Sequence, residues 1–187
     1  MIAPKTFQDC RGGFALPWLP GIGTDRLTLR QPRLDDAEAL ARHLATYDVA
    51  RMLPSLPFPY DRQDALEWLL PRASGVTAGW SLAITGNGDD TAIGVVSIER
   101  MGEDWVLGYW LAPAFWRQGL ASEAVAALVA AFRDEAPGAA LKSSVLSDNP
   151  ASFRILSGLG FRVTGCRDVF CQARGQMKTL IELALDP

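Results

Sequence analysis

The sequence has few histidines and cysteines and no long apolar run. One histidine and three cysteines occur among 187 residues, and Cys10, Cys166 and Cys171 form no C-x-x-C pair. This usage argues against structural zinc, any other metal site and a disulfide framework, and it predicts a reducing, cytoplasmic setting. Because no run reaches about 18 apolar residues, we expect no membrane span. Residues 1–11 lack a basic stretch followed by an apolar core, so we expect no secretory signal.

The chain also lacks a surplus of basic residues. It carries 18 Lys and Arg against 21 Asp and Glu, a formal net charge of −3. Proteins that grip nucleic acid usually carry a basic surplus, so we expect no nucleic-acid partner. The length fits one domain, and 49% hydrophobic with 21% charged residues is ordinary globular usage. Any anionic ligand must therefore be held by local features.

Hydrophobic periodicity predicts a mixed α/β fold with helices on both faces of a sheet. Strands are expected at 26–30, 80–85, 91–99, 105–111, 141–146, 161–170 and 177–185, and helices at 35–44, 62–72, 120–133 and 150–159. The order is β-α-α-β-β-β-α-β-α-β-β. Short connections between 105 and 146 predict a right-handed crossover and a central parallel strand pair. Residues 1–23 are interpreted as an N-terminal extension and residues 24–187 as a single domain.

A proline-rich segment from Met52 to Tyr60 interrupts this pattern. Its three prolines exclude a helix interior and a central strand, so a stiff apolar loop is predicted. Loops at the open end of such a sheet usually carry specificity. Phe58 and Tyr60, together with Tyr109 and Trp110, are therefore candidates for the wall of a substrate pocket, although such aromatic residues are also common in protein cores.

The turn before the helix at 120–133 has the features of an anion site. A helix start offers unpaired backbone N–H groups and a partial positive charge. Arg117 adds a formal charge, Gly119 lets the backbone curl toward a ligand, and Ala121 leaves the first turn unobstructed. Neither G-x-x-x-x-G-K-S/T nor G-x-G-x-x-G is present, which argues against a P-loop NTPase and a dinucleotide-binding domain. A plain turn with a surface arginine is the alternative.

Several segments of the chain, in order, resemble one enzyme superfamily. Trp116–Ala124 resembles the acyl-CoA pyrophosphate loop of the GNAT acyltransferases, Q/R-x-x-G-x-G/A. Asn149–Ser152 followed by Gly160-Phe161 resembles the motif N-x-x-S/A-x(7)-G-F of the same superfamily. Thr24–Arg30 and Gly108–Leu111 are similar to the branch of ribosomal-protein alanine and serine N-terminal acetyltransferases. The resemblance extends from about residue 24 to residue 185.

The resemblance implies a GNAT-like fold whose central parallel pair opens into an acyl-CoA cleft. It implies that acetyl-CoA, the acyl donor, is bound by Tyr109, Trp110, Leu111, Arg117, Gln118, Gly119, Leu120, Ala121, Ser122, Asn149 and Ser152. In the family, the strand supplies backbone donors to the pantetheine and the thioester, and the Asn and Ser at the later helix start bind the CoA arm. Local physics offers a second explanation, since Asn149, Pro150 and Gly160 suit helix caps. Both roles are compatible.

In the resembling family an acceptor amine attacks the thioester directly, without a metal. An α-amine with a pKa near 8 is roughly a tenth neutral at pH 7, so it needs only modest help from a base. Glu99 is the candidate base, with Glu103 and Asp104 as alternatives, and a solvated hairpin charge is the competing interpretation for each. Many members carry an acidic tyrosine where this chain has Leu156; Ser147 could substitute through a hydrogen bond.

The sequence therefore predicts an acetyltransferase that uses acetyl-CoA and a primary amine, with a protein or peptide α-amine among the possible acceptors. Two alternatives remain open. The acceptor could be a small amine such as an amino acid, a polyamine or an antibiotic, or the protein could be a non-catalytic acyl-CoA-binding module. We expect no membrane partner, and the oligomeric state is open between monomer and homodimer.

Overall fold

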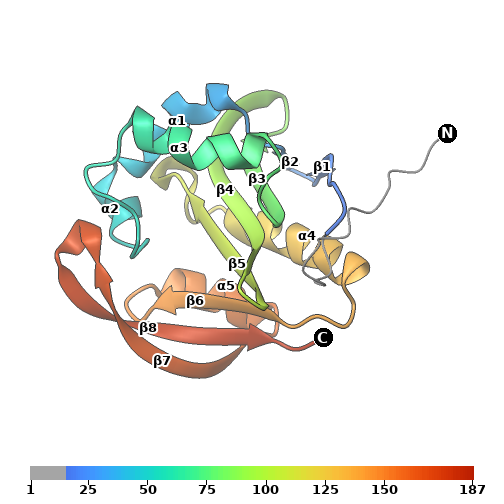
Figure 1. Ribbon diagram of the computed structural model, residues 1–187, viewed down its shortest axis with the longest axis vertical. Coiled ribbons are helices and arrows are strands. Elements are labelled where there is room, and N and C mark those ends of the chain that lie inside the picture. The colour runs from blue at the N-terminus through green and yellow to red at the C-terminus, as the bar shows by residue number, and fades with distance from the viewer. Residues whose placement is uncertain (1–15) are drawn as a thin grey trace.

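The computed structural model describes residues 16–187, which form one mixed eight-stranded sheet in the order β1-β2-β3-β4-β5-β6-β8-β7 (Figure 1). The strands are β1 (Gly21–Gly23), β2 (Leu27–Arg30), β3 (Gly79–Gly86), β4 (Asp89–Met101), β5 (Asp104–Leu111), β6 (Leu141–Leu146), β7 (Arg162–Cys171) and β8 (Gln176–Leu185). The α-helices are α1 (Ala37–Leu44), α2 (Tyr47–Ala50), α3 (Arg62–Ala73), α4 (Leu120–Glu135) and α5 (Pro150–Gly158). Three 3-10 turns accompany them: η1 (Leu34–Asp36), η2 (Pro113–Phe115) and η3 (Gln172–Arg174).

The predicted parallel pair in the middle of the sheet is confirmed. β5 and β6 pair over Trp105–Leu107 and Leu141–Ser143, and α4 makes the crossover between them. Beyond Leu107, β5 has no register partner in β6, whereas its antiparallel pairing with β4 continues to Leu111. The two parallel strands therefore diverge, which leaves the last part of β5 open along one edge.

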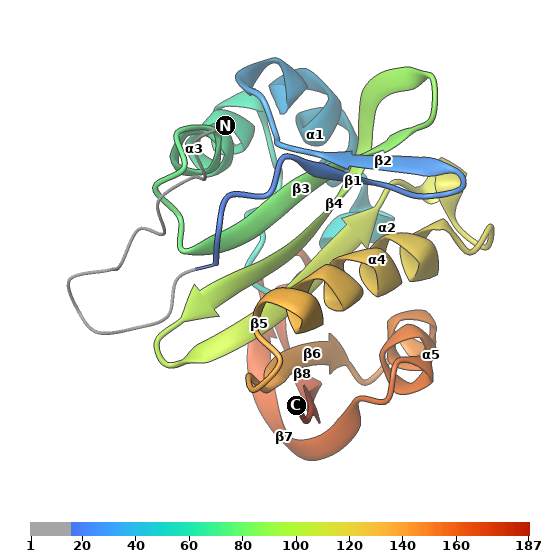
Figure 2. The same ribbon diagram turned by 90° about the vertical axis from the view of Figure 1, so that its right-hand side faces the viewer.

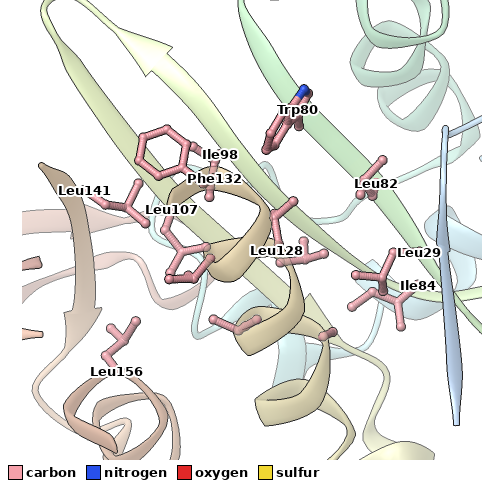
Figure 3. Close-up of a cluster of buried hydrophobic side chains, with 14 of the residues drawn as sticks. Leu29, Trp80, Leu82, Ile84, Ile98, Leu107, Leu128, Phe132, Leu141 and Leu156 are labelled. Atoms are coloured by element: carbon pink, nitrogen blue, oxygen red, sulfur yellow. The ribbon is translucent and has the colours of Figure 1, made fainter. Parts of the chain in front are cut away.

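Side-chain alternation along the central strands divides the core into two clusters. In β4, Val96 and Ile98 belong to the cluster that includes α4, while Val95 belongs to the cluster under α1 and α3. Figure 2 shows α4 on one side of the sheet and α1 and α3 on the other. Figure 3 shows how Leu128 and Phe132 of α4 meet the strand side chains in the first cluster. Each such buried side chain contributes roughly 1.5–3 kcal/mol.

The predicted elements are observed, most with ends shifted by one or two residues, and the structure adds two more. β1 pairs its backbone with residues 28–30 of β2, so part of the predicted N-terminal extension joins the sheet. α2 is one turn long, too short to leave a periodic pattern in the sequence. Residues 1–15, the first part of that predicted extension, lie outside the described residues.

Two features of the described chain bear on the kind of site it contains. Across residues 16–187, no helix is long and apolar enough to cross a membrane. The same residues contain no group of three or more His, Cys, Asp or Glu side chains that could hold a metal ion. Cys166 is exposed, Cys171 is buried, and both are free thiols.

Candidate functional site

The N-terminus of α4 is open. Its N-cap is Gly119, and no side chain of residues 16–187 accepts a hydrogen bond from the amides of Leu120–Ser122. Arg117, Gln118 and Gly119 are exposed in the preceding loop, whereas Leu120 is buried in the core. Unpaired amides at the positive end of a helix dipole, beside a guanidinium group, can hold an anion such as a phosphate.

The loop that leads into α4 curls through two left-handed residues. Gly119 has φ 77° and Arg117 has φ 61°, and Arg117 is the single non-glycine residue with positive φ within residues 16–187. This conformation costs about 1–2 kcal/mol for residues with a Cβ, which explains why glycine suits position 119. A Cβ at Gly119 would also lie 3.4 Å from the Arg26 Nη2 atom. The turn therefore depends on glycine for its shape.

Arg26 fastens this loop to the first turn of α4. Its Nη1 donates to the Gln118 carbonyl at 2.7 Å, and its Nε donates to the Glu123 carboxylate at 2.7 Å. The Thr24 hydroxyl donates to the same carboxylate at 2.6 Å. The Thr24 hydrogen bond, followed by those from Arg26, lowers the pKa of Glu123. Arg26 thus offsets the negative charge nearest the open helix end, a role that the sequence analysis did not predict.

Tyr109, Asn149 and Ser152, all predicted to contact CoA, meet across the open edge of β5. The Asn149 side chain accepts a hydrogen bond from the Ser152 amide at 3.2 Å, which confirms the predicted cap of α5, and Pro150 occupies the first turn. The Tyr109 hydroxyl donates to the Ser152 carbonyl at 3.2 Å. Burial raises the pKa of Tyr109. These contacts join the unpaired end of β5 to the start of α5.

The backbone of β5 presents polar groups along this open edge. The Leu107 carbonyl accepts a hydrogen bond from the Ser143 hydroxyl at 3.0 Å, and the Leu111 carbonyl accepts one from Trp116 Nε1 at 2.6 Å. Because alternate residues of a strand direct their backbone groups to the same edge, Tyr109 directs its N–H and C=O there as well. The open edge can therefore hydrogen-bond an extended, amide-containing ligand.

A cavity of about 400 Å³ lies on the other face of β5, bounded by α1, α3 and the loop at 53–60. Its apolar lining comprises Leu40, Leu44, Leu53, Leu56, Pro57, Tyr60, Trp68, Val95, Gly108, Tyr109 and Trp110. Tyr60, Tyr109 and Trp110 had been singled out as possible wall residues. Phe58, the fourth, is not among the lining residues; it packs edge to face on Tyr47, with ring centroids 5.8 Å apart.

The cavity also has a polar side that the sequence analysis missed. Asp64 and Glu67 of α3 and Ser55 and Ser97 complete the lining. A carboxylate on a surface helix carries no distinctive signal in a single sequence, because charged residues normally occupy solvated faces. Only the packing of α3 against the sheet places these two carboxylates on a cavity wall.

Glu99, the candidate base, forms an ion pair near this cavity. Arg72 Nε and Nη2 each donate to its carboxylate at 2.8 Å, and the Ser81 hydroxyl donates to it as well. The Arg72 guanidinium stacks 4.1 Å from the centroid of the Trp68 ring. Among the described residues, the cavity lining includes Ser97, two positions before Glu99 on β4, but not Glu99 itself. Arg72 and Ser81 thus hold the Glu99 carboxylate outside the cavity lining.

The remaining sequence predictions concern the general acid. Ser147 is exposed just after β6, and its amide donates to the Thr179 carbonyl at 2.9 Å. Leu156 is buried in the core at 1% exposure, so no acidic group occupies its position. Ser147 as the group that assists the leaving thiolate stays a prediction.

Comparison with known proteins gives the family. Residues 26–162 match the family model described as Acetyltransferase (GNAT) domain. The uncharacterized N-acetyltransferase YoaA of Bacillus subtilis is 26% identical over 155 residues, which span 78% of this chain and 85% of YoaA.

Solved structures share the fold at low identity. The ribosomal-protein-S5-alanine acetyltransferase of Vibrio fischeri has a TM-score of 0.72 at 14% identity and covers 89% of this chain and 96% of its own. RimJ of Mycobacterium smegmatis, solved in complex with CoA-disulfide, has a TM-score of 0.71 at 19% identity and covers 86% and 81%. Because the family model matches well over half of the chain, this protein belongs to the GNAT acetyltransferase family and is an acetyltransferase.

Proposed function

We propose that this acetyltransferase transfers the acetyl group of acetyl-CoA to the α-amine of a protein or peptide. One observation carries the proposal: two sites reach the end of β5 from opposite faces. The cavity touches Gly108–Trp110 from the α1 and α3 side. The uncapped N-terminus of α4 lies on the opposite side, next to the open edge of the strand, and we place CoA there. A donor thioester and an acceptor amine could therefore meet at this strand.

On the donor side, the amides of Gly119–Ser122 and the Arg117 guanidinium would hold the diphosphate of CoA. The backbone of Tyr109–Leu111 would hydrogen-bond the pantetheine arm and the thioester carbonyl, and Asn149 and Ser152 would contact the arm from α5. Backbone donors aimed at a carbonyl oxygen that gains negative charge contribute on the order of 3 kcal/mol. Holding the reacting atoms in place supplies much of the remaining acceleration.

On the acceptor side, the neutral amine attacks the thioester carbon, so a C–N bond forms while the C–S bond breaks. The amine loses a proton and the departing thiolate gains one. Since a thiol has a pKa near 8.5, a hydrogen bond from Ser147 would be sufficient help for the leaving group. We assign proton removal to Glu99 acting through water, because Arg72 and Ser81 fix its carboxylate two positions along β4 from Ser97, which lines the cavity.

Two arguments favour an α-amine over a lysine side chain, or over a small amine whose pKa is as high as that of lysine. At pH 7 an α-amine is roughly a tenth neutral, whereas a lysine with a pKa near 10.4 is less than about a thousandth neutral. The fold is also shared with a structure named as a ribosomal-protein-S5-alanine acetyltransferase, although fold similarity alone does not fix the acceptor.

The test is release of CoA thiol from acetyl-CoA with matched acceptors. One peptide carries a free α-amine and an internal lysine, and its twin is identical except that the α-amine is already acetylated. We expect thiol release and a single acetyl group, located at the N-terminus, with the first peptide only. Equal rates with both peptides, or turnover restricted to polyamines or aminoglycosides, would show that the acceptor is misassigned.

A further inference from the structure

We propose that the acceptor cavity selects for charge: Asp64, Glu67 and the Tyr60 hydroxyl favour a cationic acceptor and reject one that carries a carboxylate beside its reacting amine. The inference rests on the proposed function, because it gives a substrate class to the same acceptor site. It predicts that peptide N-termini and amino-acid amides are acetylated and that free amino acids are poor acceptors.

The two charged side chains of the cavity wall are both acidic. Asp64 and Glu67 stand three residues apart on α3, a spacing that puts them on the same helix face. They are the charged residues among the described lining, whose other members are apolar, aromatic or, like Ser55 and Ser97, uncharged and polar. The wall therefore has formal charge of one sign, negative.

The neighbouring cation, Arg72, forms an ion pair with Glu99. Both ends of its guanidinium fork donate to the Glu99 carboxylate, and its planar face lies against Trp68. Trp68 lines the cavity and Arg72 does not. Arg72 is thus paired with Glu99, and neither Asp64 nor Glu67 forms an ion pair with another residue in the range 16–187.

The Tyr60 side chain is buried in the cavity wall, and its hydroxyl has no hydrogen-bond partner among residues 16–187. Tyr60 is only 6% exposed. Burial, and next the nearby charge of Asp64, raise the pKa of Tyr60 to about 12, so the group stays a neutral phenol. A ligand that gives this hydroxyl a hydrogen-bond partner inside the cavity gains affinity. The Tyr60 hydroxyl is therefore free to bind the ammonium group or the amide carbonyl of an acceptor.

Together these features discriminate between an amide and an acid. In a free amino acid the carboxylate carbon and the amine nitrogen are bonded to the same Cα atom. The carboxylate must therefore enter the cavity together with the reacting amine. Charges in a partly enclosed cavity interact more strongly than in bulk water, because the effective dielectric constant is lower. The carboxylate meets Asp64 and Glu67 with repulsion, whereas a peptide bond or an amide carries no such charge.

The experiment compares phenylalaninamide with phenylalanine as acceptors in the thiol-release assay. The measured quantity is the ratio of their kcat/KM values, in the unmodified protein and in the double variant Asp64→Asn, Glu67→Gln. Because both acceptors are assayed at one pH, the difference between their own amine pKa values cancels when the two proteins are compared. Both substitutions keep an oxygen for the hydrogen bonds that these side chains accept from Asp61 N and Gln63 Nε2.

We expect the ratio to fall by about threefold or more in the double variant, mainly because phenylalanine improves. The matched control is Asp134→Asn, Glu135→Gln, which removes the same charge from exposed positions at the far end of α4 and should leave the ratio unchanged. The single variant Glu67→Gln, at an exposed helix position, repeats the test if the double variant is unstable.

The hydroxyl is tested separately by Tyr60→Phe. We expect a rise in KM for phenylalaninamide of about threefold or more, with KM for acetyl-CoA unchanged. Tyr47→Phe, which changes an exposed tyrosine outside the cavity lining, is the control and should alter neither constant. Turnover with a ratio that the charge variants do not change would overturn the charge selection alone. No thiol release with either acceptor, from a protein that acetylates the peptide, would overturn this inference alone, and no release with the peptide would overturn the proposed function as well.

Discussion

At the scale of single residues, the absence of a side chain at Gly119 affects both the backbone conformation and the binding of a ligand. Its left-handed φ closes the turn before α4, and the missing side chain leaves the first-turn amides accessible. A substitution there acts on stability through the backbone and on binding through steric access. A matched glycine elsewhere can separate these effects.

Gly119→Ala is expected to weaken the binding of CoA by at least about tenfold and to lower the free energy of unfolding by about 1 kcal/mol. The control is Gly102→Ala, in the turn between β4 and β5, where φ is 66° and no atom lies within 4 Å of the added Cβ. Gly102→Ala should lower the free energy of unfolding by a similar amount and leave the affinity for CoA unchanged. Titration calorimetry and urea unfolding measure the two quantities. Equal CoA affinity in both variants would mean that the α4 turn does not hold the diphosphate.

At the scale of elements, Arg174 joins three segments around the site. It lies in η3, between β7 and β8, and its side chain is only 4% exposed. Its Nε donates to the Arg51 carbonyl at 2.7 Å, and its Nη1 donates to Asp148 at 2.5 Å, one residue before the α5 cap. The same turn also donates from the Gln172 amide to the Pro54 carbonyl at 3.1 Å. The hairpin thus holds the acceptor loop and the start of α5 together.

Arg174→Met is expected to lower the free energy of unfolding by about 1–3 kcal/mol at pH 7, because it leaves several polar groups without their partner. The control is Arg162→Met, whose pair with Asp186 is exposed and spans 3.7 Å; it should change stability by less than about 0.5 kcal/mol. Urea unfolding of both variants tests this. A loss no larger than that of the control would mean that the hairpin contacts contribute little.

The same pair makes the loss depend on pH. The hydrogen bond from Arg174 lowers the pKa of Asp148 in the folded protein. A lowered pKa stabilises the fold at pH values above the ordinary aspartate value of about 3.9, and this contribution disappears as the pH falls through the folded pKa. The stability difference between the unmodified protein and Arg174→Met should therefore narrow between pH 5 and pH 2.5. A constant difference over that range would exclude the ion pair as its source.

At the scale of the whole molecule, helices on the two faces of the sheet flank the same strand, β5. α4 and α5 flank the side proposed for CoA, and α1 and α3 enclose the acceptor cavity. Since Tyr60 has a pKa of about 12, this cavity tyrosine does not change its charge over the pH range of an ordinary assay. The acceptor amine itself should then govern the pH dependence.

With a peptide acceptor, kcat/KM is expected to rise about tenfold per pH unit at low pH and to level off near the α-amine pKa, about 8. Initial rates between pH 6 and pH 9.5 measure this profile. Replacing the peptide with an acceptor whose amine is less basic should move the midpoint down by the same amount. If the midpoint of the pH profile does not move, the pH dependence comes from a titrating group of the enzyme and not from the acceptor amine.

The sequence by itself determined most of the fold, because its information there is local. The alternation at 26–30 in β2, the apolar stripe of α4 and the caps at Asn149 and Gly160 all depend on neighbours within a few residues, and the structure contains each of them. The glycine turn at 119 was found for the same reason. α2 and β1 escaped prediction because one helical turn and three residues of edge strand are too short to carry a period.

The tertiary structure alone decided which distant residues share a site. Tyr109 and Ser152 are 43 residues apart, and Arg72 and Glu99 are 27 apart, yet each pair is in contact. The cavity brings α3 against the end of β5, which turned Asp64 and Glu67 from ordinary helix-surface residues into part of a wall and left Phe58 outside it. Periodicity reports which face of an element is buried, but the partner on that face depends on how the elements pack, and a single sequence does not record this.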